Sequence, residues 1–119
     1  MNYKAIYTTQ KSAAAAAADL KNQLKDFNTS MLIFFASSAL DPADVSKEIS
    51  KTFPQTVVAG CSTSGELVSG LMLDNAISAM AFNDKAISDI KLEVLLNIKE
   101  DDQAVSKAFA SFEKHYKTP

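Results

Sequence analysis

The sequence contains no arginine: all twelve of its basic residues are lysines, set against 14 acidic residues. The planar guanidinium group of arginine is well suited to grip phosphates and guanine edges, so its absence argues against a dedicated nucleic-acid or nucleotide-phosphate site. The lysines are also scattered along the chain, which is typical of a solvated surface. We therefore expect no nucleic-acid partner.

Cysteine and histidine occur only once each, as Cys61 and His115. A single cysteine excludes an intramolecular disulfide, and these counts exclude a zinc site with two cysteines or two histidines. The first seven residues lack the plan of a signal peptide, and no apolar run approaches the ~20 residues that span a bilayer. We expect a cytoplasmic protein, with neither export nor membrane insertion.

A length of 119 residues predicts a single domain over residues 1–119, and apolar periodicity predicts alternating strands and helices in its first half. Strands are predicted at residues 1–7, 31–36 and 55–59, and the last two are continuous apolar runs typical of covered strands. The intervening helices, residues 12–27 and 41–53, start at the caps Ser12 and Asp41. This βαβαβ order predicts three parallel strands joined by crossover helices.

The second half predicts a different pattern, because residues 76–82 and 90–98 are strand candidates joined by a short link. Such a link favours an antiparallel pair. Apolar and mostly polar residues alternate over 90–98, so one face of that strand should be buried. Asp101 or Asp102 should cap a C-terminal helix whose end reaches residues 115–119. The predicted fold is thus an α/β mixed sheet of about five strands with a C-terminal helix.

Small polar residues follow two of the predicted parallel strands, at the edge where open α/β sheets usually bind ligands. Ser37 and Ser38 follow the first, and residues 60–66 follow the second, where Gly60 and Gly65 suggest a tight turn. Glu66 stands where a phosphate-binding loop has lysine, and its carboxylate would favour an ammonium group. The candidate ligand-binding residues are Ser37, Ser38, Gly60, Cys61, Ser62, Thr63, Ser64, Gly65 and Glu66.

Three alternatives stay open. Cys61 could be the nucleophile of a thiol-dependent enzyme, although no base lies near it in sequence and a lone cysteine is more often a small hydrophobic residue. His115 could ligate haem iron, although its place at a helix end fits a solvated residue stabilised by the helix dipole. The half-covered strand at residues 90–98 could instead serve a scaffold or a homodimer. We expect no catalytic residue and no metal ion.

The residues Val57–Leu67, with Gly-Cys-Ser-Thr-Ser-Gly-Glu at their centre, resemble the signature segment of the FIST N-terminal domain. The alanine-rich first helix and the strands at residues 32–37 and 78–82 occur in the same order as in that family. The resemblance implies a bacterial intracellular sensory module that binds a small molecule, such as an amino acid, and some members bind haem. It assigns Gly60, Cys61, Ser62, Thr63, Gly65 and Glu66 to the site, with no catalytic role.

The family's N-terminal domain continues beyond the length of this chain and is usually followed by a second FIST domain. The resemblance therefore implies a truncated fragment, with the remaining FIST domain and an output domain expected in the full-length protein. A binding site assembled from both halves would be only half present in residues 1–119.

Overall fold

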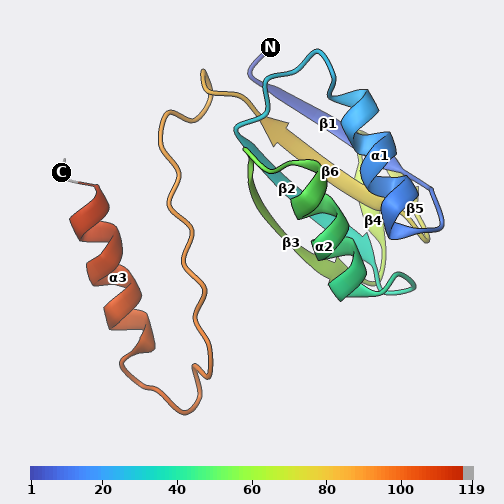
Figure 1. The fold of residues 1–119 in the computed structure, drawn as a ribbon. Coiled ribbons are helices and arrows are strands. Elements are labelled where there is room, and N and C mark those ends of the chain that lie inside the picture. Colours follow the sequence, from blue (N-terminus) through green and yellow to red (C-terminus); the bar gives the residue numbers. More distant parts are fainter. Residues whose placement is uncertain (117–119) are drawn as a thin grey trace. The chain divides into compact units, whose positions relative to one another are not determined.

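The computed structural model describes residues 1–116, which form two compact units (Figure 1). The first unit, Met1–Ser88, contains two helices and six strands, and the second, from Asp89 onward, contains the helix α3. The α/β class and the mixed sheet predicted from periodicity are confirmed. No helix within residues 1–116 is long and apolar enough to cross a membrane.

A four-stranded sheet with the order β1, β6, β2, β3 forms the centre of the first unit. β2 and β3 are parallel, whereas β6 runs antiparallel to both of its neighbours, β1 and β2. The three predicted strands thus share one direction, but β6 separates the first two, so their predicted side-by-side arrangement is wrong for β1. Most of β6 is buried, which suits a central position. The strands are β1 (Tyr3–Thr8), β2 (Met31–Ser37), β3 (Val57–Thr63) and β6 (Ile77–Phe82).

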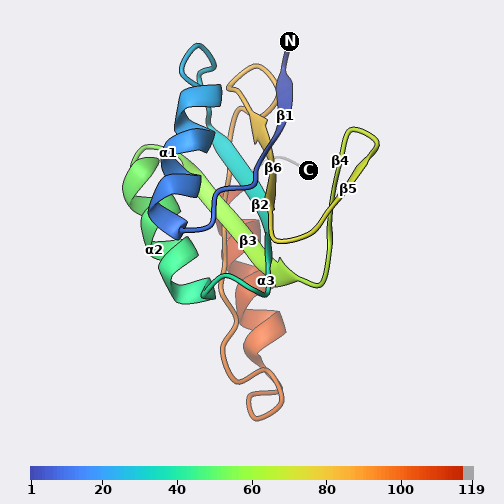
Figure 2. The same cartoon turned by 90° about the vertical axis from the view of Figure 1, so that its right-hand side faces the viewer.

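Two helices, α1 (Ala13–Gln23) and α2 (Pro42–Thr52), cover the same face of this sheet (Figure 2). Both begin at the predicted caps. The Ser12 side chain accepts a hydrogen bond from the Ala15 amide at 3.2 Å, and the Asp41 carboxylate accepts one from the Asp44 amide at 2.9 Å. These bonds satisfy amides of the first turn that have no partner within the helix.

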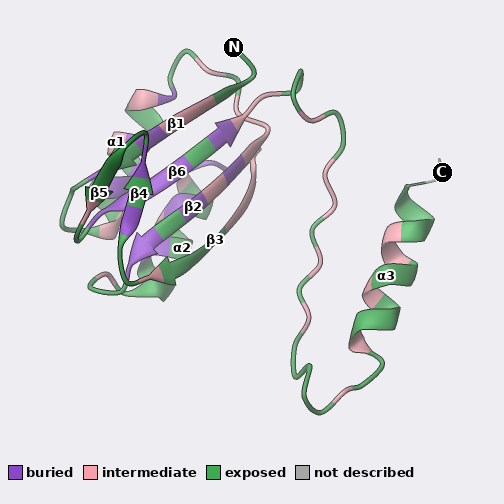
Figure 3. Ribbon diagram, turned by 180° about the vertical axis from the view of Figure 1, so that it is seen from behind, coloured by how far each residue is buried: buried purple, intermediate pink, exposed green. Residues whose placement is uncertain are grey.

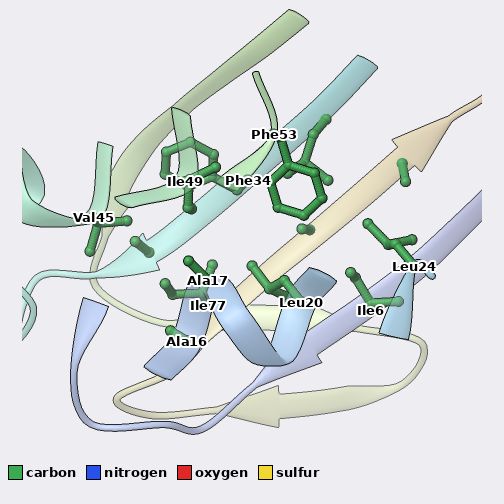
Figure 4. Packing of buried hydrophobic residues seen from close by; sticks show 14 residues of the cluster. Ile6, Ala16, Ala17, Leu20, Leu24, Phe34, Val45, Ile49, Phe53 and Ile77 are labelled. Atoms are coloured by element: carbon green, nitrogen blue, oxygen red, sulfur yellow. The ribbon is translucent and has the colours of Figure 1, made fainter. Parts of the chain in front are cut away.

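The hydrophobic core lies between these helices and the sheet (Figure 4). Leu20 of α1 and Ile49 of α2 are fully buried there, and burying a side chain of this size stabilises the fold by roughly 1.5–3 kcal/mol. Ala16 and Ala17 are also buried, so the alanine-rich stretch provides a smooth helix surface that lies close to the sheet. The core thereby fixes α1 and α2 over one face and leaves the other face for different contacts.

A short hairpin of β4 (Glu66–Val68) and β5 (Leu71–Leu73) lies on the opposite side of the sheet from the helices (Figure 2). Its two turn residues, Ser69 and Gly70, both have positive φ, 45° and 85°, as a type I′ turn requires. The hairpin forms a two-stranded sheet of its own, without ladder bonds to the four-stranded sheet. It was not among the predicted elements.

β3 begins two residues later than predicted and continues to Thr63. Residues 60–63 therefore lie in a strand, and the prediction that they form a loop is wrong. The loop prediction fails at Gly60, which pairs with Phe34 of β2 inside the sheet. A Cβ at Gly60 would lie only 2.5 Å from the Phe34 ring, so this glycine makes room for an aromatic side chain and has no turn to serve.

The predicted strand at residues 90–98 does not form. Its expected partner β6 already has β1 and β2 on its two sides, so no edge of β6 is free for a third strand. The segment is extended, and its apolar side chains are exposed where burial of one face was expected, among them Leu92, Val94, Leu96 and Ile98.

The C-terminal helix α3 (Ala104–His115) confirms the predicted helix but corrects its start. The cap residue is Gln103, whose side chain makes no capping bond, while Asp101 accepts a hydrogen bond from the Gln103 amide at 3.0 Å in the preceding turn. No residue of α3 is buried (Figure 3). The predicted end of this helix includes residues 117–119, which lie outside the described residues.

Candidate functional site

The parallel pairing of β2 and β3 brings together two of the segments that the sequence singled out. Ser37 lies opposite Thr63 at the carboxyl ends of the two strands. The Ser38 amide donates a hydrogen bond to the Thr63 carbonyl at 3.0 Å, and the Thr63 hydroxyl lies 3.5 Å from the Ala36 carbonyl oxygen. The expected convergence of strand ends is therefore present in the fold.

Glu66 joins this cluster from the hairpin. Glu66 is only 1% exposed, because the first strand of the hairpin turns Glu66 and Val68 inward and Leu67 outward. The Thr63 hydroxyl donates to Oε1 of Glu66 at 2.8 Å, and the Ala76 amide donates to Oε2 at 3.4 Å. The carboxylate is thus fixed by one side chain and one backbone group.

The backbone of Ala76 links the cluster to β6, since its carbonyl accepts a hydrogen bond from the Ser37 amide at 2.9 Å. Ala76 precedes β6 and is fully buried. Sequence reasoning missed this residue, because its contribution comes from the main chain and no side-chain pattern identifies it. The ends of β2 and β3, the start of β4 and the residue before β6 therefore meet around the Glu66 carboxylate.

Glu66 has no cation beside it in the described part of the chain. The ion pairs formed by residues 1–116 join Lys91 to Glu93, Lys107 to Asp101 and His115 to Asp89. A buried carboxylate loses its hydration, and an opposite charge or several hydrogen bonds normally compensate that loss. Here two hydrogen bonds provide the compensation, and an opposite charge is lacking.

Ser38, Ser64 and Gly65 form an exposed rim beside this cluster, whereas the Ser62 side chain alternates with that of Thr63 along β3 and lies on the other face of the sheet. Ser38, Ser62, Ser64 and Gly65 are exposed, whereas the Ser37 hydroxyl is buried and accepts a hydrogen bond from the Ala39 amide at 3.2 Å. The rim presents hydroxyl groups and backbone atoms to solvent, and it carries no charged side chain.

Cys61 lies within β3, and its thiol is exposed. The sole histidine is in the other unit, where Nε2 of His115 lies 2.8 Å from an oxygen of Asp89 and the ring packs edge-on against Tyr116. His115 is therefore held by a carboxylate of its own unit. No group of three or more potential metal ligands is found among residues 1–116.

Comparison with known proteins adds the family. A model of the FIST N domain matches residues 30–118, a span that includes β2, β3, the hairpin and β6. No curated protein and no solved structure matches the chain. The matched span contains every candidate site residue from Ser37 to Glu66. The chain therefore belongs to the FIST N domain family, a family of sensory domains in signal transduction.

Proposed function

We propose that this domain senses a small polar metabolite carrying an ammonium group, such as an amino acid, at the carboxyl ends of β2 and β3. The observation that carries the proposal is the Glu66 carboxylate, which is buried without a neighbouring cation among residues 1–116. A ligand ammonium group would supply the missing opposite charge in a region of low dielectric, where such a pair is strong.

The polar rim supports binding of the rest of the ligand, beyond its ammonium group. The exposed hydroxyl of Ser38 is a donor and acceptor suited to a ligand carboxylate or carbonyl group. The absence of arginine and the presence of Glu66 disfavour phosphorylated ligands at this position. The proposed ligand is therefore small, polar and free of phosphate.

Entry to the carboxylate requires a shift of the β4–β5 hairpin, because Glu66 is enclosed. The hairpin has no ladder bonds to the main sheet, so moving it breaks few backbone hydrogen bonds. Leu67 and Met72 on the hairpin are largely exposed, so the apolar contact that the shift would disrupt is chiefly that of the buried Val68. Ligand binding would thus be coupled to the hairpin position, and movement of the hairpin on binding would be the signal to an output domain.

Thermal-shift screening against amino acids and related amines tests the proposal. A ligand at one hundred times its Kd adds about 2.7 kcal/mol to the free energy of unfolding, which raises Tm by roughly 10–20 °C. Glu66→Gln keeps a hydrogen-bond acceptor but removes the charge, so it should abolish the shift. Glu113→Gln, an exposed carboxylate on α3, is the matched control and should leave the shift intact. A shift that survives in Glu66→Gln would refute the assignment.

A further inference from the structure

The face of the sheet that carries the hairpin has a row of three side chains next to the Glu66 site. Tyr7 of β1, Ser78 of β6 and Phe35 of β2 lie opposite one another across three neighbouring strands. The residue before each of them belongs to the hydrophobic core, so all three side chains point to the face away from the helices. Ser78 is two residues along the chain from Ala76, whose amide donates to Glu66.

The row has a small, buried centre between two half-exposed rings. Ser78 is 4% exposed, whereas Tyr7 is 39% and Phe35 44% exposed. Neighbouring strands lie about 4.8 Å apart and side chains stand roughly perpendicular to the sheet, so the two aromatic residues are about 9.6 Å apart. One hydrocarbon chain in contact with both rings needs about 7–8 Å, because carbon atoms in contact lie about 3.5–4.0 Å apart. The spacing therefore suits one aliphatic side chain between the rings.

The hairpin already presents an apolar side chain to this face of the sheet. β4 contacts β1, β2 and β6, and its inward residues are Glu66 and Val68 (Figure 3). Val68 is 8% exposed but is not part of the core between the helices and the sheet, so its burial comes from the hairpin side of the sheet. The carboxylate and an apolar group are thus accommodated there side by side.

β1, β6 and β2 carry no charged side chain on this face. The side chains that point to it are aromatic, aliphatic, thioether or hydroxyl groups, and Lys4 of β1 is on the helix side, where it donates to the Gln23 carbonyl. A charged ligand group placed here would lose its hydration without gaining an opposite charge. An apolar group gains free energy by leaving water.

We propose that the sensed ligand is an amino acid with an aliphatic side chain, and that this side chain lies over Ser78 between Tyr7 and Phe35. The inference rests on the proposed function, in which the ammonium group of the ligand pairs with Glu66. The hairpin shift that opens Glu66 also lifts Val68, because both residues are on the inward side of β4. The ligand side chain then takes the place of Val68, and the two rings determine which side chain is accepted.

Isothermal titration calorimetry with leucine and glycine tests the assignment, because these probes share the ammonium and carboxylate groups and differ only in the side chain. Leucine should bind the wild-type chain at least about tenfold more tightly than glycine, equivalent to 1.4 kcal/mol. Tyr7→Ala and Phe35→Ala should each weaken leucine binding and leave the Kd of glycine unchanged. Tyr3→Ala is the matched control, because Tyr3 is an exposed residue on the same face of β1, four residues from Tyr7. It should change neither Kd.

The outcomes separate this inference from the proposed function. Circular dichroism first checks that the variants stay folded. Equal Kd values for leucine and glycine in the wild type, or leucine binding that Tyr7→Ala and Phe35→Ala leave unchanged, overturn the position of the side chain. If Glu66→Gln still abolishes binding in that case, ammonium recognition stands without it. A wild-type chain that binds neither amino acid overturns both.

Discussion

Replacing Gly60 by alanine tests the account of the β2–β3 contact that underlies the site. Gly60 and Phe34 lie opposite each other in the parallel ladder, and the Phe34 side chain is 7% exposed within the core. An added Cβ would meet three ring atoms at 2.5–2.6 Å, well inside normal contact. The ring packs among other core side chains, so it has little freedom to move away.

The expected loss in the free energy of unfolding follows from overpacking, which typically costs about 1–3 kcal/mol in a well-packed core. For a domain of this size, Tm should fall by roughly 4–8 °C per kcal/mol. Alanine also restricts the unfolded chain, which offsets about 0.4–1 kcal/mol. Gly65→Ala measures that offset, because a Cβ at Gly65 meets no atom within 4 Å.

Urea unfolding followed by circular dichroism provides the assay. Gly60→Ala should unfold at lower urea than wild type, and Gly65→Ala at the same or higher urea. A smaller side chain in Phe34→Leu should relieve the clash, so the double variant should lose less than the sum of the single variants, with a coupling energy of about 0.5–3 kcal/mol. Equal stability of Gly60→Ala and Gly65→Ala would refute the reasoning.

Three further predictions concern local structure. Asp41→Ala removes the bond to the Asp44 amide and should lower the free energy of unfolding by about 1 kcal/mol in urea titration. Ser69→Asn suits the positive φ of that turn residue and should raise Tm in calorimetry, since asparagine before glycine favours type I′ turns. The hydrogen bond from Ser111 and the nearby Lys91 lower the pKa of Glu93 below its ordinary 4.5. The stabilisation that they give the fold is therefore present above pH 4.5 and is lost as the pH falls through the lowered pKa. Ser111→Ala should raise the pKa of Glu93 in an NMR titration.

Local signals in the sequence predicted the elements near them. Ser12 and Asp41 mark both helix starts because a cap acts on amides only two or three residues away. The apolar run from Met31 gave β2 for the same reason, since a strand covered on both faces needs no alternation. The Ser69–Gly70 pair carried a turn signal for the hairpin as well, but the flanking strands are only three residues each.

These local signals do not predict which strands pair when the strands lie far apart in the sequence. The insertion of β6 between β1 and β2 depends on contacts far apart in the chain, and the short link after β6 favoured a different partner. The sequence alone favours a turn at Gly60, because glycine serves both turns and close packing, and only the opposing Phe34 distinguishes the two. The convergence of Ser37 with Thr63 was predictable from parallel strands, whereas the Ala76 amide on Glu66 was not.

Backbone NMR of the isotope-labelled domain, titrated with an amine or amino acid that raises Tm, tests the proposed ligand site most directly. The account predicts that the largest shifts occur at the amides of Ser38, Thr63 and Ala76, and that they vanish in Glu66→Gln. Shifts centred on another part of the chain, or unchanged shifts in Glu66→Gln, would contradict it.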